Sequence, residues 1–409
     1  MSIVCRSCGS TALEPVLSLG STPLANSLLT DEDLERPETR YPLDLVFCSD
    51  CTLVQITLSV PPEEMFEEYA YFSSFADMVV ENARSISTRL IRERSLGADD
   101  LAMEIASNDG YLLKNYVEAG VPVLGVDPAR NIAGVAEANG VPTLCDFFGI
   151  AVAKQLRDQG RRASVIHANN VLAHVPDANG VVAGIATVLA DDGVAVVETP
   201  YVRNMVDELE FDTIYHEHLF YYSAHALCAL FERNGLTMVD VEQLPIHGGT
   251  LRVFAARSEF AAPLPAVEEL LRTERAAGMT AIGYYQDFAA RVSRLAEQLR
   301  TLLASLRADG ATIAAYGAAA KGATLLNYSG IGTETIAFVA DRNVHKQGRY
   351  MPGVRLPIVD PAELLVRRPD YLLLLAWNFA EEIIVQQVEY AAGGGRFIVP
   401  VPEPRIVAG

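Results

Sequence analysis

Two histidines, a glutamate and a tyrosine stand together in "YHEH", Tyr215 to His218, within the run "FDTIYHEHLFYYS". Imidazole, carboxylate and phenol groups can bind a metal or move protons. The helical zinc-protease motif needs a second histidine four residues after the first, and Phe220 stands there instead. On a strand, His216 and His218 would share one face and Glu217 would point away. The segment alone leaves a metal site, an acid–base site and a polar structural strand open.

Four of the six cysteines form two Cys-x-x-Cys pairs, Cys5 with Cys8 and Cys48 with Cys51. Together they offer four thiolates, the ligand set of a tetrahedral zinc ion. The two pairs are about 40 residues apart, which is longer than in an ordinary zinc ribbon. Unconnected pairs or redox-active thiols are therefore the alternatives. Four protein ligands leave no coordination position open, so we expect the metal to be structural.

Composition narrows the classes of partner. The chain has 409 residues, half of them hydrophobic, and a formal net charge of -20. Such a charge disfavours nucleic acids and anionic membranes as partners. No apolar run reaches the roughly 20 residues of a membrane span, and the opening "MSIVCRSCGS" lacks the apolar core of a signal peptide. We expect a cytoplasmic protein, monomeric, with reduced cysteines.

The elements that must position these residues change in character along the chain. Residues 1 to about 60 carry the cysteine pairs, and residues 61 to 97 show a helical pattern that begins at prolines and ends at a glycine. From about residue 100, apolar strands alternate with helical stretches, which predicts a parallel sheet with helices on both faces. Further strands are expected near 236–257, and a charged helical connector over 263–308.

A second, smaller series of strands and helices follows. Its strands are expected in "ATIAAYG", "TIAFVADRN", "PDYLLLLAWN" and "RFIVPVP". We therefore expect an α/β protein of three domains: a zinc-binding domain with a helical extension (1–75), a Rossmann-like domain (76–262), and a helical connector with a smaller Rossmann-like domain (263–409).

The loop after the first strand of the middle domain is typical of cofactor binding. "EIASNDGYLL" runs from Glu104 to Leu113 and joins a strand to a helix, as in the nucleoside-binding loop of a Rossmann-like half. Only Gly110 is present of the G-x-G-x-x-G fingerprint, which argues against NAD. Asp127 ends the next strand, where an acid binds ribose hydroxyls. A plain turn glycine is the alternative for Gly110.

The segments "GVDP", "CDFF", "NNVLAHVPD" and "VVETP", following that loop in order, resemble a class I methyltransferase that uses S-adenosylmethionine (SAM). With the four cysteines, "YHEHLFYYS", "HGGTLR" and "YGAAAKG", the whole chain resembles the SAM-dependent sugar C-methyltransferases of deoxysugar nucleotide biosynthesis. Within them it resembles the branch that methylates C-3′ in tetronitrose biosynthesis. One departure is that the usual glycine-rich motif reads "ASNDG" here.

The resemblance implies a set of SAM contacts. Methionine and ribose would lie along the loop, the ribose hydroxyls on the acid that ends the second strand, and the adenine against an acid and an aromatic ring. These residues are Glu104, Ala106, Asn108, Gly110, Asp127, Asp146 and Phe147, with Asn169 near the methionine end. Asn108 and Asp109 would fill space that glycine usually leaves. Core packing is the alternative for Phe147.

C-methylation beside a ketone removes a proton to form an enolate, which attacks the sulfonium methyl group and releases S-adenosylhomocysteine. An imidazole suits the base, because its ordinary pKa of about 6.5 lies near working pH. A phenol or second imidazole can hydrogen-bond the enolate oxygen. By resemblance, His218 is the expected base, and the ketone is lined by Tyr215, His174 and Tyr69. Glu217 would orient an imidazole or bind the sugar. A structural histidine is the alternative for His218 and more so for His216.

"YGAAAKG", Tyr316 to Gly322, ends a strand and opens a helix in the carboxy-terminal domain. Free N–H groups at a helix start and a lysine attract phosphate. We expect this region to hold the diphosphate of a nucleotide sugar, through Tyr316, Gly317, Lys321 and Arg342, with His247 and Arg252 of "HGGTLR" reaching the same cleft. A structural turn or a second dinucleotide site are the alternatives.

The expected function is SAM-dependent methylation at C-3′ of a dTDP-4-keto-deoxysugar, either 2,3,6-trideoxy-3-amino or 2,6-dideoxy, in antibiotic sugar biosynthesis. O- or N-methylation of a small metabolite is one rival. An NAD-dependent dehydrogenase is another, and a zinc-ribbon scaffold for protein partners is the last.

Overall fold

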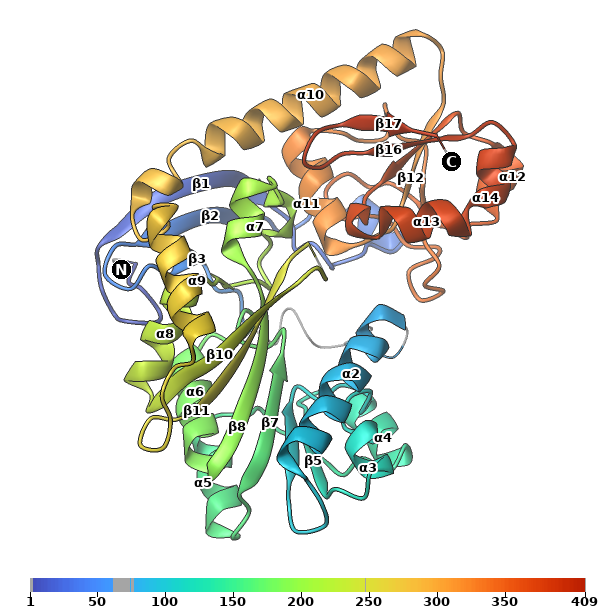
Figure 1. Cartoon of the computed structure of the whole chain (residues 1–409). Helices are drawn as coiled ribbons and strands as arrows, with labels where there is room; N and C mark the ends of the chain where they lie inside the picture. Colours follow the sequence, from blue (N-terminus) through green and yellow to red (C-terminus); the bar gives the residue numbers. More distant parts are fainter. Residues whose placement is uncertain (1–2, 62–73, 75–76, 247, 409) are drawn as a thin grey trace.

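The computed structural model describes residues 3–61, 74, 77–246 and 248–408. The described strands form three sheets, of four, seven and six strands. In Figure 1 the seven-stranded sheet occupies the lower part of the molecule and the other two lie above it. Within the described ranges, no helix combines the length and apolar character needed to cross a membrane.

The amino-terminal sheet is antiparallel throughout and has the strand order β1-β2-β3-β9. Its strands are β1 (Leu13–Thr22), β2 (Tyr41–Cys48), β3 (Val54–Ile56) and β9 (Phe220–Tyr221), and the 3₁₀ helix η1 (Glu32–Glu35) lies between β1 and β2. The last strand comes from far along the chain. It begins two residues after His218, so the "YHEH" segment is anchored at the edge of this sheet.

The seven-stranded sheet has the order β10-β11-β8-β7-β4-β5-β6. Its strands from β8 to β6 are parallel, and β11 and β10 are antiparallel additions at one edge. The strands are β4 (Ala102–Ile105), β5 (Val123–Val126), β6 (Thr143–Leu144), β7 (Ala163–Asn169), β8 (Leu189–Pro200), β10 (Leu236–Leu244) and β11 (Thr250–Arg257). The β4 residues are all buried, as expected of a strand that is covered on both faces.

Helices cover and connect these strands. They are α2 (Asp77–Arg94), α3 (Lys114–Glu118), α4 (Arg130–Ala138), α5 (Ile150–Asp158), α6 (Ala178–Val188), α7 (Val202–Asp207), η3 (Phe211–Thr213) and α8 (Ala224–Arg233). Helices α6 and α8 each begin at a side-chain cap, Asp177 and Ser223, that accepts a hydrogen bond from a first-turn N–H. These caps fix where the connections after β7 and β9 end.

The third sheet has the order β14-β13-β12-β15-β16-β17 and is parallel except for β17. Its strands are β12 (Ile313–Tyr316), β13 (Val339–Ala340), β14 (Ile358–Val359), β15 (Tyr371–Leu374), β16 (Arg396–Val399) and β17 (Arg405–Val407). The accompanying helices are α11 (Ala320–Ser329), α12 (Glu363–Arg367), η5 (Trp377–Phe379), α13 (Ala380–Gln386) and α14 (Val388–Ala392). This is the smaller α/β unit that the sequence predicts.

Several contacts join the first and third sheets. The long helix α10 (Phe288–Ala308) packs against both β1 and α11 (Figure 1). Leu29 and Tyr350 exchange two backbone hydrogen bonds of 2.9 Å, and the Arg355 guanidinium lies 3.3 Å from the Glu38 carboxylate. One continuous buried cluster then runs from Cys5 to Val401. The three sheets therefore share a core.

The charged region and the "YHEH" segment differ from the expected elements, and the helix expected over 61–97 is only partly described. The charged region 263–308 is two helices, α9 (Pro265–Ala276) and α10, separated by the 3₁₀ helix η4 (Ile282–Tyr284). The helix expected over 61–97 is described only from Asp77, where α2 begins, because most of its first part lies outside the described residues. The "YHEH" segment is a turn, not a strand, and strand structure starts at Phe220.

Candidate active site

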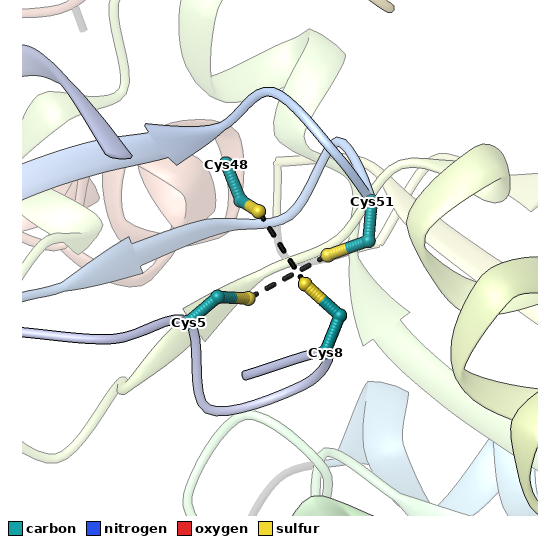
Figure 2. Close-up of side chains that lie close together, drawn as sticks. All are labelled: Cys5, Cys8, Cys48 and Cys51. Carbon is teal, nitrogen blue, oxygen red and sulfur yellow. Dashed lines mark hydrogen bonds between the residues drawn. The ribbon is translucent and has the colours of Figure 1, made fainter. Parts of the chain in front are cut away.

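The four cysteine sulfurs converge in the amino-terminal sheet. Figure 2 shows Cys5 and Cys8 of the first loop facing Cys48, at the end of β2, and Cys51, in the turn before β3. The Sγ atoms of Cys5 and Cys51 are 3.5 Å apart, those of Cys8 and Cys48 are 3.6 Å apart, and all four lie within 4.8 Å of one another. A zinc ion with Zn–S bonds of about 2.3 Å sets its sulfurs roughly 3.8 Å apart. The four thiolates fit a closed, structural zinc site.

The loop after β4 adopts an unusual backbone. Ala106, Asn108 and Gly110 all have positive φ, at 53°, 49° and 80°. A side chain at Gly110 would also place its Cβ 2.9 Å from Val141, so this position needs glycine for both conformation and space. Asn108 and Asp109 are buried, as expected of residues that replace glycines of the usual motif.

Asp127, at the end of β5, holds this loop in place. Its Oδ2 accepts a 3.0 Å hydrogen bond from the Asn108 N–H, and its Oδ1 accepts a 2.9 Å hydrogen bond from the Ala129 N–H. Burial raises the pKa of this carboxyl, and the two N–H donors oppose the rise. A carboxylate so oriented keeps lone pairs free for hydroxyl donors.

Several buried polar atoms around the loop have no partner among the described residues. They are Glu104 Oε2, Ser107 Oγ, Asp109 Oδ1 and Asn169 Oδ1. Burial raises the pKa of Glu104 well above its ordinary value, and nearby Asp127 and Asp109 add to the rise. Unsatisfied buried acceptors are costly and point to a missing donor. The ammonium and hydroxyl groups of SAM are donors of this kind, so these acceptor oxygens fit the cofactor.

The two residues expected at the adenine lie at the rim of this region. Asp146 is exposed, and its Oδ1 accepts a hydrogen bond from the Phe147 N–H. Phe147 is 66% exposed, which excludes the core-packing alternative. A solvent-exposed aromatic ring is available to stack on a base. Stacking of Phe147 on adenine therefore stays a prediction, and core packing is no longer an alternative to it.

The imidazole of His218 is fixed by two hydrogen bonds. Its Nδ1 lies 2.9 Å from the Thr213 carbonyl oxygen, and its Nε2 lies 2.8 Å from the Tyr215 hydroxyl. A carbonyl oxygen can only accept, so Nδ1 carries the proton and Nε2 has the free lone pair. The Tyr215 O–H therefore donates to Nε2. His218 is thus held as the Nδ1–H tautomer, and its basic nitrogen, Nε2, faces the Tyr215 hydroxyl.

Two aromatic neighbours enclose His218. The His174 ring lies edge-on at 4.7 Å between centroids, and the Tyr215 ring is 4.1 Å away. Burial, His174 and the Lys321 charge lower the pKa of His218 well below its ordinary value. Burial also lowers the pKa of His174 to about 4. Both imidazoles are therefore neutral near pH 7, which a proton acceptor requires.

The other members of the motif face different parts of the molecule. His216 is buried, and its Nε2 lies 3.3 Å from the Pro42 carbonyl of the amino-terminal sheet. Its bond to that sheet favours the structural alternative. Glu217 Oε1 accepts a 2.6 Å hydrogen bond from Asn26, and burial raises the pKa of this carboxyl. Tyr69, expected beside the ketone, lies outside the described residues.

In the third sheet, Asp341 follows β13 and organises the loop after β12. Its Oδ2 accepts from the Ala318 N–H at 2.6 Å, and its Oδ1 accepts from the Asn343 N–H at 2.8 Å. The Lys346 ammonium donates to the Ala318 carbonyl oxygen at 2.8 Å. A Cβ at Gly317 would lie 2.9 Å from the Ala376 side chain, so the loop passes close to the next strand's end.

The four residues expected at the diphosphate differ in exposure. Tyr316 is buried, and its hydroxyl accepts a 3.3 Å hydrogen bond from Gln387. Arg342 is exposed beside Asp341. Lys321 is half-buried in the first turn of α11, donates to Asn378 Oδ1 at 3.0 Å, and lies 4.4 Å from the centroid of the Trp377 ring. Its charge also acts on His218. Lys321 therefore follows closely in the chain the loop that Asp341 holds, and its charge acts on His218.

Arg252 behaves differently from the expectation. It is 5% exposed in β11, and its guanidinium bonds Glu198 at 2.7 Å, Glu242 at 3.2 Å and Asn82 of α2 at 2.7 Å. All three nitrogens are thus engaged with the seven-stranded sheet and α2. This arrangement favours a structural role over the expected nucleotide contact. His247, its expected companion, lies outside the described residues.

Three residues near this site were not singled out from the sequence: Glu210, Asp212 and Trp377. Burial raises the pKa of Glu210 to about 8 and that of Asp212 to about 6. Trp377 donates a 2.7 Å hydrogen bond to Asp212. The one available signal was that Trp377 is the only tryptophan in the chain.

Family models match three successive parts of the chain. Their descriptions are "Putative zinc binding domain" for residues 5–66, "Methyltransferase domain" for residues 82–241, and "C-methyltransferase C-terminal domain" for residues 245–402. The C-methyltransferase NovU of Streptomyces niveus is 42% identical over 405 residues, which cover 99% of this chain and 96% of NovU.

Solved structures match over smaller parts. The magnesium protoporphyrin IX methyltransferase of Synechocystis with bound SAM is 16% identical, with a TM-score of 0.34 over 44% of this chain and 79% of its own. A SAM-dependent methyltransferase of Clostridium acetobutylicum is 11% identical, with a TM-score of 0.36 over 48% of this chain and 95% of its own.

Proposed function

Because the chain belongs to the family of SAM-dependent C-methyltransferases, to which its relationship with NovU assigns it, we propose that it methylates C-3′ of a dTDP-4-keto-deoxysugar. The sugar would be a 2,3,6-trideoxy-3-amino or a 2,6-dideoxy sugar of antibiotic biosynthesis. The methyl acceptor is a carbon, so the enzyme must first create a carbanion. The site around His218 supports this step.

The observation that carries the proposal is the fixed tautomer of His218. The Thr213 carbonyl accepts from Nδ1, which leaves Nε2 as the basic nitrogen. When substrate binds, the Tyr215 O–H turns from Nε2 to the ketone oxygen. Nε2 then takes the C-3′ proton, while the phenol hydrogen-bonds the enolate oxygen as negative charge develops there. An O- or N-methyltransferase would not need a base paired with an oxyanion donor in this way.

SAM, when bound, supplies an electrophilic methyl group. The protein's own residues would position SAM. Asp127 and Asn108 shape the loop after β4, and oxygens of Glu104, Asp109 and Asn169 that have no partner among the described residues would accept hydrogen bonds from its ammonium and hydroxyl groups. Asn169 ends β7, and the neighbouring segment 171–174 leads directly to His174. Asn169, at the proposed cofactor site, and His174, whose ring packs against His218, therefore lie on one short stretch of chain.

The nucleotide part of the substrate is proposed to bind the third sheet. Asp341 would accept from the ribose hydroxyls, and the amino terminus of α11 with Lys321 would hold the diphosphate. Lys321 follows the loop that Asp341 holds and its charge acts on His218, which supports the order nucleoside, diphosphate, sugar. Tyr316, Gly317 and Arg342 line the same loop. Glu217, whose carboxylate accepts from Asn26, would bind a hydroxyl or amino group of the sugar.

We further propose that the enzyme acts as a cytoplasmic monomer. Its net charge of -20 disfavours nucleic acid and anionic membranes as partners. Incubating the purified enzyme with SAM and a panel of dTDP-4-ketosugars tests the function. We expect a mass gain of one methyl group, located at C-3′. Calorimetric titration with SAM and with NADH, showing binding of SAM alone, excludes the dehydrogenase; methylation only at oxygen or nitrogen would overturn the proposal.

A further inference from the structure

A fully buried carboxylate lies just before the "YHEH" segment. Asp212, in η3, has an exposed fraction of 0%. Its Oδ2 accepts a 2.7 Å hydrogen bond from Trp377 Nε1, and its Oδ1 has no partner among the described residues. A buried carboxylate is costly unless hydrogen bonds and a nearby positive charge stabilise it. Asp212 therefore needs a compensating charge nearby.

The compensating charge is Lys321. Its ammonium lies over the Trp377 ring, 4.4 Å from the centroid, and attracts both Asp212 and Glu210. Lys321 belongs to α11 and Trp377 to η5, and both elements belong to the third sheet. Side chains of the third α/β unit thus stabilise Asp212 through a hydrogen bond from Trp377 and the positive charge of Lys321.

A second contact holds the same segment two residues later. The Thr324 hydroxyl, on the next turn of α11 after Lys321, donates a 3.2 Å hydrogen bond to the Ile214 carbonyl oxygen. Helix α11 packs directly on η3. Residues on both sides of Thr213 are therefore anchored to the third sheet.

Thr213 is the residue that orients the base. Its carbonyl oxygen accepts from His218 Nδ1 at 2.9 Å, and its own hydroxyl donates to the Glu210 carbonyl oxygen at 2.6 Å. A shift of this carbonyl would release the imidazole to rotate or to change tautomer. The geometry of a catalytic imidazole is sensitive to such a partner.

We propose that the hydrogen bond between Asp212 and Trp377 is a positioning contact for His218: it fixes the Thr213 carbonyl and so keeps Nε2 directed at the substrate. The catalytic meaning of this contact rests on the proposed role of His218 as the base. Asp212 and Trp377 act through Thr213 and touch neither the substrate nor SAM. The third sheet thereby becomes part of the catalytic apparatus as well as the proposed nucleotide site.

Three variants test the contact kinetically. Trp377→Phe keeps a ring beneath Lys321 but removes the N–H, Asp212→Ala removes the acceptor, and Asp212→Asn retains an acceptor oxygen. We expect the first two to lower kcat about tenfold, with the KM of the ketosugar and the Kd of SAM changed less than twofold. Asp212→Asn should stay within about threefold of wild type, because the amide oxygen still accepts from the indole.

The double variant Trp377→Phe with Asp212→Ala should lose no more activity than either single variant, since both remove the same bond. Multiplicative losses, or a rise in KM with unchanged kcat, would overturn the positioning role. Because Trp377 is the only tryptophan, its emission in Asp212→Ala and Asp212→Asn reports whether the indole contact is lost, and melting curves show whether each variant is folded.

A readout without substrate separates this inference from the proposed function. In ¹⁵N-histidine-labelled protein, the His218 signals are identified by their loss in His218→Gln. We expect the Nδ1–H tautomer in wild type and in Asp212→Asn, and a mixture of tautomers in Trp377→Phe and Asp212→Ala. A single unchanged tautomer in all variants contradicts the contact. Failure of wild type to methylate any ketosugar would instead overturn the proposed function and leave this spectrum to decide the contact.

Discussion

Asp127 and Asp341 make the same pair of hydrogen bonds in two different sheets. Each carboxylate follows a strand, accepts one N–H from the loop of the neighbouring strand through Oδ2, and accepts the N–H two residues further on through Oδ1. Both loops therefore present backbone and a carboxylate at the carboxyl edge of a parallel sheet, which is where such sheets bind nucleosides.

The two aspartates give a crossed prediction. Asp127→Asn should weaken SAM about tenfold or more, because an acceptor for the ribose hydroxyls becomes a donor, and should leave nucleotide-sugar affinity unchanged. Asp341→Asn should do the reverse. Calorimetric titration of each variant with both ligands checks this, and each variant serves as the other's control. Weakening of SAM by Asp341→Asn would mean that the ligands are not divided between the sheets as we propose.

Phe147 offers a test of the adenine site with little risk to folding. The ring is 66% exposed, so Phe147→Ala removes almost no core packing, and its melting temperature should match that of wild type. We expect SAM to bind about fivefold to tenfold more weakly, because base–aromatic stacking contributes on the order of 1–3 kcal/mol. Phe260, 57% exposed on another surface, provides the matched control as Phe260→Ala. Equal SAM affinity in both variants would remove Phe147 from the site.

Removal of one zinc ligand should unfold the amino-terminal sheet. Elemental analysis is expected to find one zinc per chain, and Cys48→Ser should lose the metal and much of the protein's solubility, since structural zinc contributes directly to folding. Cys145 is exposed and outside the cluster, so Cys145→Ser should keep both. Full zinc retention in Cys48→Ser would rule out the four-thiolate site.

The lowered pKa of His218 predicts the direction in which the acidic limb of the pH profile of kcat/KM is shifted. A base works when neutral, so lowering its pKa keeps it active at lower pH. The acidic limb of kcat/KM should therefore lie below the ordinary histidine value of about 6.5. Lys321→Met removes one cause of the shift and should move that limb to higher pH, in addition to any loss of substrate affinity. A wild-type limb at or above 6.5 that disappears in His218→Gln would contradict the assignment.

Much of the fold could be predicted because its strands are short, apolar and regularly separated. "AMEI" and "IAAY" are entirely buried, and each ends at a loop that the sequence marks with small residues. The position of Asp127 could be predicted for the same reason: in a parallel sheet, the residue that ends a strand lies at the binding edge. The four-cysteine cluster could also be predicted, because only the residue type and the spacing within each pair are needed to recognise it.

The parts that could not be predicted depend on long-range partners. Phe220 and Tyr221 form a two-residue strand only because β3, more than 150 positions earlier, offers an edge. The sequence next to "YHEH" carries no signal that this segment forms a turn before that strand. Asp212 and Trp377 are 165 positions apart. Arg252 was assigned to the nucleotide by its charge, whereas its environment of Glu198, Glu242 and Asn82 became visible only in three dimensions. The domain limits 1–75, 76–262 and 263–409 stay a proposal.

The most direct test of the central claim compares His218→Gln with His216→Gln. Only His218 presents Nε2 beside Tyr215, whereas His216 bonds the Pro42 carbonyl of the amino-terminal sheet. With S-adenosylhomocysteine in place of SAM, the wild type should exchange the C-3′ proton of its ketosugar for solvent deuterium. His218→Gln should lose this exchange, and methylation with it, by a factor of about 10² or more while still binding both ligands. His216→Gln should retain both activities. Exchange at the wild-type rate in His218→Gln would show that another group is the base, and His174 and Tyr69 would then become the candidates.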